Sequence, residues 1–440
     1  MASWPLWATA SCGTLLTALL ALHAGDRLLK PSSKADGTPR QSSDAFVRFR
    51  RQYLAAYFLV MFADWLQGTH MYSLYQSYGV NISALFLTGF LSSAIFGHWI
   101  GAVVDRYGRR NACLVYCALE VVINLLENVP NMTLLLVGRV LGGVSTSLLF
   151  SAFESWMVTE HRARGTWREL LPKTFAIASE GNGVLAVVAG FAAQAAADAV
   201  GEIGPFRLAV VVTVLAAAVV YSWTENYGLP AAAPASTTPA AARGSAGLSA
   251  EAVALGLCYS LFDGAMYVFV FLWYPTLEAV VPAAVLPSGL VFSSFMLCIA
   301  IGGKLFDQLG GRVREELFVC VLCGVAVVAL LVPTLTRSYA WILGAFFAFE
   351  VTIGAFSPCC ATLRSRHFPA EGLSNTLGLF RLPTNVLVVL GTGGANYLSS
   401  EQLFACCSGV LALSTLCGWR LLQSPHGRAA AARGRAKKRN

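Results

Sequence analysis

Two arginines stand inside long apolar stretches of the sequence, where a permanent positive charge needs a partner. Arg139 lies in Gly-Arg-Val-Leu-Gly-Gly, and Arg381 lies in Leu-Phe-Arg-Leu-Pro. A guanidinium stays charged and presents a planar fork of donors that suits an oxyanion. The two residues predict either a site for a small anion or structural arginine–carboxylate pairs that brace a helix bundle. The sequence keeps both interpretations open.

Uncharged and acidic side chains accompany these arginines. Asp64 and Gln67 are three residues apart and share one face of a helix, so both are candidates for the substrate site. Ser145 follows Arg139 in the same apolar stretch and is a further candidate. Asp64 is also a candidate for carrying a coupling proton, with a structural pairing to an arginine as the equal alternative.

Further carboxylates in apolar stretches are candidates for proton coupling. Glu180 occupies nearly the same place in the first half of the chain as Arg381 does in the second, so it is also a candidate partner. Glu350 and Asp263 are weaker candidates. A charge at the centre of a lipid-facing helix costs roughly 2.5–3.5 kcal/mol, so most of these residues must face protein or a polar cavity. The ionisable residues in apolar stretches are Asp64, Glu120, Arg139, Glu154, Glu180, Asp263, Glu350 and Arg381.

The composition indicates that membrane-spanning helices position these side chains. Hydrophobic residues make up 56% of the chain and charged residues only 12%. A helix needs about 20 mostly apolar residues to cross the bilayer core. The sequence predicts an all-α membrane protein with one leading helix and twelve more, over residues 4–22, 53–73, 82–104, 111–128, 132–157, 173–197, 206–223, 250–273, 285–304, 316–334, 339–361, 373–396 and 403–421.

The positions of lysine and arginine set the expected orientation. If the turn at 105–110 is cytosolic, only Arg207 and Arg337 fall outside and only Arg139 and Arg381 fall within the membrane. The net charge of +8 therefore needs no nucleic acid as partner. We expect the leading helix to be a retained anchor with its N-terminus outside, because basic residues follow it; a cleaved signal peptide is the alternative. Asn81 and Asn131 match the glycosylation pattern on outer loops.

Five segments follow from this layout. An anchor helix with a basic cytosolic segment covers 1–50, and six-helix halves cover 51–223 and 250–423. Between them, 224–249 is rich in proline, alanine, serine and threonine and reads as a flexible cytosolic linker. Residues 424–440 form a basic cytosolic tail, whose charges suit solubility or anionic lipid headgroups.

A charged turn appears once in each half. Gly101-Ala-Val-Val-Asp-Arg-Tyr-Gly-Arg-Arg110 returns in weaker form as Gly303-Lys-Leu-Phe-Asp-Gln-Leu-Gly-Gly-Arg312. Glycine permits close helix approach and tight reversal, and aspartate can accept hydrogen bonds at a helix N-terminus. We expect Arg109 or Arg110 to pair with Glu154. The expected gating residues are Gly101, Asp105, Arg106, Gly108, Arg109, Arg110, Glu154 and Asp307.

Two six-helix halves joined by an inner linker, with this turn between the second and third helices of a half, resemble the major facilitator superfamily. The resemblance implies that the turn helps to latch the two halves together in the outward-open state. The second copy has lost two of the cationic positions, at Gln308 and Gly311, so we expect a weaker latch there.

Within that superfamily the chain resembles the eukaryotic molybdate-anion transporter family. The strings that carry the resemblance are Ala63–Gly68, the turn at Gly101–Arg110, Gly138–Trp156, Phe269–Trp273, Phe292–Met296 and Phe380–Pro383. The linker and tail carry no family pattern. The resemblance implies high-affinity uptake of molybdate, a doubly charged oxyanion, across the plasma membrane. Our hypothesis is transport by alternating access, with Arg139 and Arg381 binding the anion.

Two other functions stay open. One is a carrier for another small solute, such as sulfate, phosphate, an organic anion or a sugar, and the other is a membrane sensor that does not transport. An enzyme is the least favoured class, because no nucleotide loop or nucleophile–base arrangement stands out. We expect no cofactor and no metal site, and Cys320 and Cys323 read as helix packing. Oligomeric state is not readable from the sequence.

Overall fold

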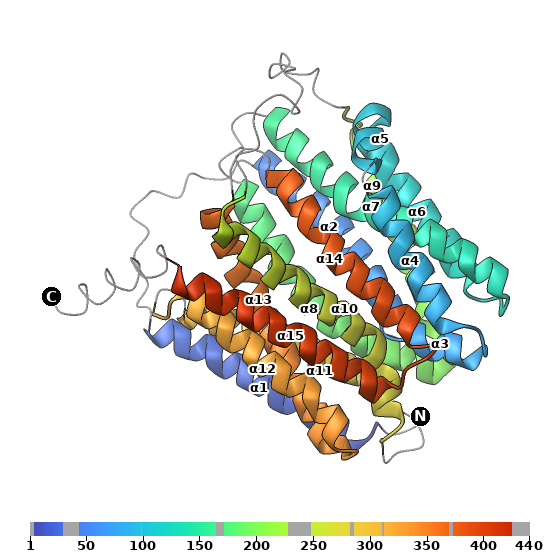
Figure 1. Cartoon of the computed structure of the whole chain (residues 1–440). Coiled ribbons are helices and arrows are strands. Elements are labelled where there is room, and N and C mark those ends of the chain that lie inside the picture. The colour runs from blue at the N-terminus through green and yellow to red at the C-terminus, as the bar shows by residue number, and fades with distance from the viewer. Residues whose placement is uncertain are drawn as a thin grey trace. The chain divides into compact units, whose positions relative to one another are not determined.

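The computed structural model describes residues 4–29, 44–97, 99–163, 171–227, 248–281, 286–309, 312–368 and 373–424 (Figure 1). Helices make up nearly all of them. Their bounds are α1 Leu6–Leu29, α2 Asp44–Gly68, α3 Met71–Ser77, α4 Ile82–Phe96, α5 Ile100–Tyr107, α6 Arg109–Leu126, α7 Met132–Ala163, α8 Leu171–Val200, α9 Gly204–Tyr221, α10 Ala250–Glu278, α11 Ser288–Leu309, α12 Glu315–Leu335, α13 Tyr339–His367, α14 Leu373–Gly394 and α15 Ser400–Gln423.

The expected all-α membrane fold is confirmed in outline. Among the described residues, nine helices are long and apolar enough to cross a bilayer, and α4 is a shorter apolar helix. The remaining long helices, α2, α6 and α14, contain more polar and charged residues. The predicted span 53–73 is divided between α2 and α3, and the span 82–104 between α4 and α5.

The chain forms two compact units, each of which is described by itself. The first contains α2 to α9 and residues 287–293 at the start of α11. The second contains α1, α10, the rest of α11 and α12 to α15. The expected linker lies outside the described residues over 228–247, as does the tail from 425 onward.

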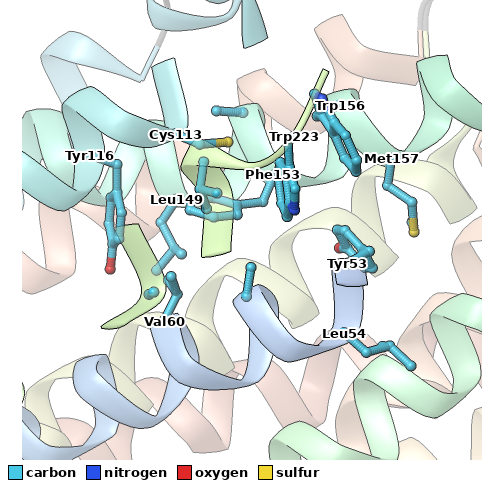
Figure 2. Close-up of a cluster of buried hydrophobic side chains, with 14 of the residues drawn as sticks. Tyr53, Leu54, Val60, Cys113, Tyr116, Leu149, Phe153, Trp156, Met157 and Trp223 are labelled. Atoms are coloured by element: carbon cyan, nitrogen blue, oxygen red, sulfur yellow. The ribbon is translucent and has the colours of Figure 1, made fainter. Parts of the chain in front are cut away.

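The core of the first unit is built around α2, α6, α7 and α9. Figure 2 shows its buried side chains, in which residues of α2 face those of α6 and α7. The rings of Trp156 and Trp223 stack at 3.9 Å between centroids. The Trp156 indole N–H also donates to the Thr224 carbonyl at 2.9 Å. The segment that follows α9 is therefore held against α7 by this stacking and this hydrogen bond before the linker begins.

In the second unit, α10 packs against α13, α14 and α15, and α12 packs against α13 and α15. The leading helix α1 belongs to this unit. Its Cys12 sulfur lies 3.1 Å from the Ser294 hydroxyl of α11, and its Leu22 carbonyl accepts a hydrogen bond from the Gln308 amide at 3.0 Å. Gln308, one of the two departures of the second charged turn, thus holds α1.

Candidate functional site

Arg139 of α7 is held in an ion pair. Its Nη2 lies 2.7 Å from Oε1 of Glu127, the residue that ends α6. The Tyr75 hydroxyl donates to the same oxygen at 2.8 Å, and the guanidinium lies over the Tyr75 ring at 5.7 Å. Glu127 is fully buried. These contacts favour the structural interpretation of Arg139, as an arginine that braces the first unit.

Gln67 and Ser145 donate to one buried carboxylate of α6. The Gln67 amide donates to Oε2 of Glu120 at 2.9 Å, and the Ser145 hydroxyl donates to Oε1 at 2.5 Å. All three side chains are buried. Two of the expected substrate-binding residues therefore have their donors directed at Glu120.

Asp64 lies half-buried on α2 near this group. Glu120 is the charged residue that acts on it electrostatically, and no hydrogen bond to its carboxylate occurs within the described segments. The structure thus brings Asp64, Gln67 and Ser145 to one place, as the helical spacing predicts. The group contains two carboxyl groups, those of Asp64 and Glu120, and the nearby cation Arg139 pairs with Glu127.

Arg381 of α14 has a different environment. Its side chain is exposed, and it forms no hydrogen bond or ion pair with any residue that the structure describes. Its charge acts on Tyr259, Asp263 and Tyr267 of α10. These three residues are spaced four apart and share one helical face. Arg381 therefore lies against a face that carries two phenols and one carboxylate.

Close packing of α10 and α14 fixes the backbone beside Arg381. The Ser260 hydroxyl donates to the Phe380 carbonyl at 2.5 Å, and the Thr384 hydroxyl donates to the Ser260 carbonyl at 3.1 Å. Pro383 has no N–H and so leaves a carbonyl one turn earlier without its usual helical donor. A Cβ on Gly256 would lie 2.2 Å from the Phe380 ring. A side chain at position 256 would have to displace the Phe380 ring, so this glycine permits the close approach of α14 at the residue next to Arg381.

The cation Arg364, near the C-terminal end of α13, also faces this part of α10. Its guanidinium lies 4.7 Å from the centroid of the Tyr259 ring. It acts electrostatically on Asp263, as Arg381 does. Reasoning from the sequence missed this residue, because the predicted span ended at 361 and Arg364 was counted among cytosolic loop charges. Because α13 continues to His367, Arg364 lies on this helix and not in a loop.

In the charged turn, the partner expected for Arg109 was wrong. Its Nη2 pairs with Asp105 at 2.6 Å, and its Nη1 donates to the Tyr227 carbonyl at 2.7 Å. Glu154 is exposed on α7. The Arg110 guanidinium lies over the Tyr221 ring at 5.1 Å. The helical reach of four residues brings Asp105 to Arg109, and the turn contacts the segment after α9.

Glu225, in that segment, takes the place at a helix N-terminus that was expected for Asp105. Its carboxylate accepts the backbone N–H groups of Arg110 and Asn111 at 2.9 and 3.0 Å, at the start of α6. A negative charge is stabilised there by the helix dipole. Gly108 has a φ of 99°, which confirms the tight reversal expected of it. A Cβ there would lie 2.7 Å from the Glu225 carboxyl.

The other expected gating residues are less engaged. Gly101 lies in α5, and the Arg106 guanidinium is 5.5 Å from the centroid of the Tyr107 ring. Asp307 is exposed on α11. Gly310 and Gly311 of the second turn fall outside the described residues.

The two remaining proton-coupling candidates differ in burial. Glu180 is exposed on α8 of the first unit, whereas its suggested partner Arg381 belongs to the second. Glu350 is buried on α13, and its Oε2 has no hydrogen-bond partner among the described residues. No group of three or more His, Cys, Asp or Glu side chains in the described parts of the chain is arranged to hold a metal ion.

Comparisons with known proteins agree with this architecture. Residues 15–351 match a family model described as sugar transporters with twelve transmembrane segments. The chain is 34% identical over 423 residues to a molybdate-anion transporter of Xenopus tropicalis, covering 91% of each chain. It is 31% identical over 424 residues to a molybdate-anion transporter of Danio rerio, covering 85% of this chain and 87% of the relative.

Solved structures share the fold. The nucleoside transporter NupG aligns with a TM-score of 0.65 at 8% identity, over 86% of this chain and all of its own. A peptide transporter of the POT type, solved in complex with sulfate, aligns with a TM-score of 0.64 at 16% identity, over 85% of this chain and 93% of its own. At these identities the likeness concerns the fold alone.

Proposed function

Because the chain belongs to the major facilitator superfamily and, within it, to the molybdate-anion transporter family, we propose that it takes up molybdate across the plasma membrane with high affinity by alternating access. It is a multi-pass membrane protein, and its family consists of transporters rather than enzymes. The substrate in this proposal is a small anion, and the lipid bilayer is a further partner.

The observation that carries the proposal is the unpaired guanidinium of Arg381. An arginine on a membrane helix is costly unless an anion or a polar cavity compensates it. Arg139 already has Glu127 at 2.7 Å, whereas Arg381 has no such acceptor within the described segments. A tetrahedral dianion would accept hydrogen bonds from the N–H groups of Arg381, which have no acceptor among the described residues. In this proposal Arg381 binds substrate directly, and Asp64, Gln67 and Ser145 shape the first unit.

A sugar carrier is the second candidate, because the matching family model carries that description. A neutral sugar offers hydroxyl groups but no charge to offset a guanidinium. The electrostatics around Arg381 therefore support an anion over a hexose. Proton coupling through Asp64, Glu180 or Glu350 stays a prediction.

Uptake of radiolabelled molybdate tests the proposal. Cells that express the chain should accumulate molybdate at nanomolar supply faster than cells with the empty vector. The degree to which excess sulfate or phosphate reduces molybdate uptake measures the selectivity of the site among oxyanions. Hexoses should not reduce molybdate uptake. Competition by hexoses, with no molybdate accumulation, would overturn the proposal in favour of a sugar carrier. Binding without flux in proteoliposomes would instead indicate a sensor.

A further inference from the structure

The cytosolic half of the second unit holds two arginines and one carboxylate that interact without direct contact. Arg364 and Arg381 are the cations that act on Asp263. No ion pair joins either of them to Asp263 in the part of the chain that the structure describes. Two guanidinium groups on different helices thus have their hydrogen-bond donors available on the same side of α10.

The geometry suits a doubly charged oxyanion better than a single arginine would. Each guanidinium can donate two parallel hydrogen bonds to an oxyanion. The Arg364 guanidinium lies 4.7 Å from the centroid of the Tyr259 ring, and the backbone next to Arg381 is held by the contacts of Phe380 with Ser260 and Gly256. Arg364 thus lies beside Tyr259, and Arg381 follows the residue whose carbonyl contacts Ser260, so both flank the segment of α10 that carries Asp263.

The charge balance of this group assigns a role to Asp263. Two guanidinium groups and one carboxylate sum to one positive charge. A bound dianion would change that sum to one negative charge, which is costly within a membrane-spanning helix bundle. If the Asp263 carboxylate takes up one proton from solution, the occupied site becomes neutral, and the anion itself is unchanged.

The other groups that face Asp263 do not alter this balance. Among the described residues they are Tyr259 and Tyr267 on its own helix and Cys360 on α13, all of which are neutral in ordinary conditions. The packed helix α15 contributes no charged group that acts on Asp263 among the described residues. Without a bound anion, the Asp263 carboxylate is therefore the negative charge with which both arginines interact.

We propose that Arg364 and Arg381 together bind the oxyanion and that Asp263 takes up one proton as the anion binds. The inference rests on the proposed function, since it assumes an oxyanion as cargo. The anion site expected from the sequence combined Arg139 with Arg381. In this proposal the anion site consists of Arg364 and Arg381, which belong to the same unit. The proton site likewise moves from Asp64 to Asp263.

Calorimetry of the purified full-length protein with sodium molybdate tests the proton step. Titrations at one pH in buffers of different ionisation enthalpy give the number of protons taken up per bound anion. We expect about one proton for the wild type and about zero for Asp263→Asn, with binding retained. Proton uptake that persists in Asp263→Asn, or that is absent from the wild type while molybdate binds, would overturn the proposal.

The arginines are tested with a matched control on the same helix. Arg364→Ala and Arg381→Ala should each weaken molybdate binding about 10- to 100-fold, and Arg364→Lys should restore part of the loss. Arg366→Ala should change binding less than about twofold, because Arg366 already pairs with Glu315 at 2.9 Å near the surface. Normal binding in a folded Arg364→Ala protein would refute its role. A wild type that binds neither molybdate nor sulfate would refute the proposed function itself.

Discussion

Arg139 and Glu127 form a buried ion pair across the turn between α6 and α7, with 2.7 Å between Nη2 and Oε1. Glu127 also accepts the Tyr75 hydroxyl, and its backbone carbonyl accepts the Tyr78 hydroxyl at 2.7 Å. The pair ties two antiparallel helices and the short helix α3 together. Glu127 thus takes one Nη of Arg139, while the Nε of Arg139 has no hydrogen-bond partner among the described residues.

Removal of one partner should destabilise the protein strongly. Glu127→Ala leaves the Arg139 guanidinium without its acceptor, and loss of one partner of a buried pair costs about 3–5 kcal/mol. Thermal unfolding of the detergent-purified protein should show a large decrease in Tm. The double variant Glu127→Leu with Arg139→Met should recover much of the loss, because no charge is then left alone.

An exposed pair provides the control for this experiment. Arg337 and Glu401 lie 3.2 Å apart at the surface. Exposed pairs contribute about 0–1 kcal/mol, so Glu401→Ala should scarcely change the Tm. If Arg139→Met keeps normal stability but abolishes molybdate uptake, the structural interpretation is wrong and Arg139 belongs to the substrate site.

The junction of Gly108 with Glu225 gives a second prediction. Gly108→Ala places a Cβ 2.7 Å from the Glu225 carboxyl, on a backbone with φ of 99°. The strain costs about 1–3 kcal/mol, and it should separate Glu225 from the start of α6. We expect less uptake and easier proteolysis after α9. The exposed Gly79 has a φ of 66° but no atom within 4 Å, so Gly79→Ala separates backbone strain from the loss of the Glu225 contact.

Glu225→Gln tests the electrostatic part of the same junction. The amide keeps the shape of the side chain but loses the negative charge at the N-terminus of α6, which is worth about 0.3–1 kcal/mol. The Tm should fall slightly, and less than in Gly108→Ala. An equal fall in both variants would show that the charge, rather than the close contact, holds the segment.

The sequence predicted these features unequally, for reasons that the structure makes clear. The reversal at Gly108 was predictable, because a local backbone requirement appears directly as a glycine between charged residues. The contacts of the Arg110 backbone and of Arg139 were not, because Glu225 and Glu127 reach them only through tertiary packing, whereas Asp105, the partner of Arg109, lies one helical turn before it. A carboxylate at a helix end can satisfy many cations, and one sequence does not rank them.

Helix length decided what could be predicted about the second unit. Arg381 was found because it interrupts an apolar stretch, which is a one-dimensional signal. Arg364 was missed because α13 continues six residues beyond the predicted end of its span, at 361, to His367. Charged residues at an inner helix end look the same in sequence whether they face the cytosol or a binding site. The ring of Tyr259 beneath Arg364 becomes visible only in three dimensions.

The close contact of α10 with α14 gives a third prediction. Gly256→Ala would place a Cβ 2.2 Å from the Phe380 ring. Overpacking of this kind costs about 1–3 kcal/mol, and any shift of Phe380 displaces Arg381 next to it. Molybdate uptake should fall although every charge is kept. Gly324→Ala in α12, where no atom lies within 4 Å, should leave uptake unchanged; equal effects would show that uptake does not depend on the α10–α14 contact.

The hydroxyl of Ser145 provides the last prediction, which separates a structural role from substrate binding in the first unit. Ser145→Ala removes a donor that lies 2.5 Å from Oε1 of buried Glu120. An unsatisfied buried acceptor costs about 1–3 kcal/mol, so the Tm should fall. The KM for molybdate should not change, because the hydroxyl is already directed at Glu120.

Thr146→Val is the matched control for Ser145→Ala, since the Thr146 hydroxyl only donates to the Gly142 carbonyl of its own helix. It should alter neither Tm nor KM appreciably. A raised KM in Ser145→Ala, with an unchanged Tm, would place Ser145 at the anion instead. Gln67→Leu should repeat the result of Ser145→Ala, because its amide donates to the other oxygen of Glu120 at 2.9 Å. Agreement between the two variants would identify Glu120 as the centre of a structural group that holds α2, α6 and α7 together.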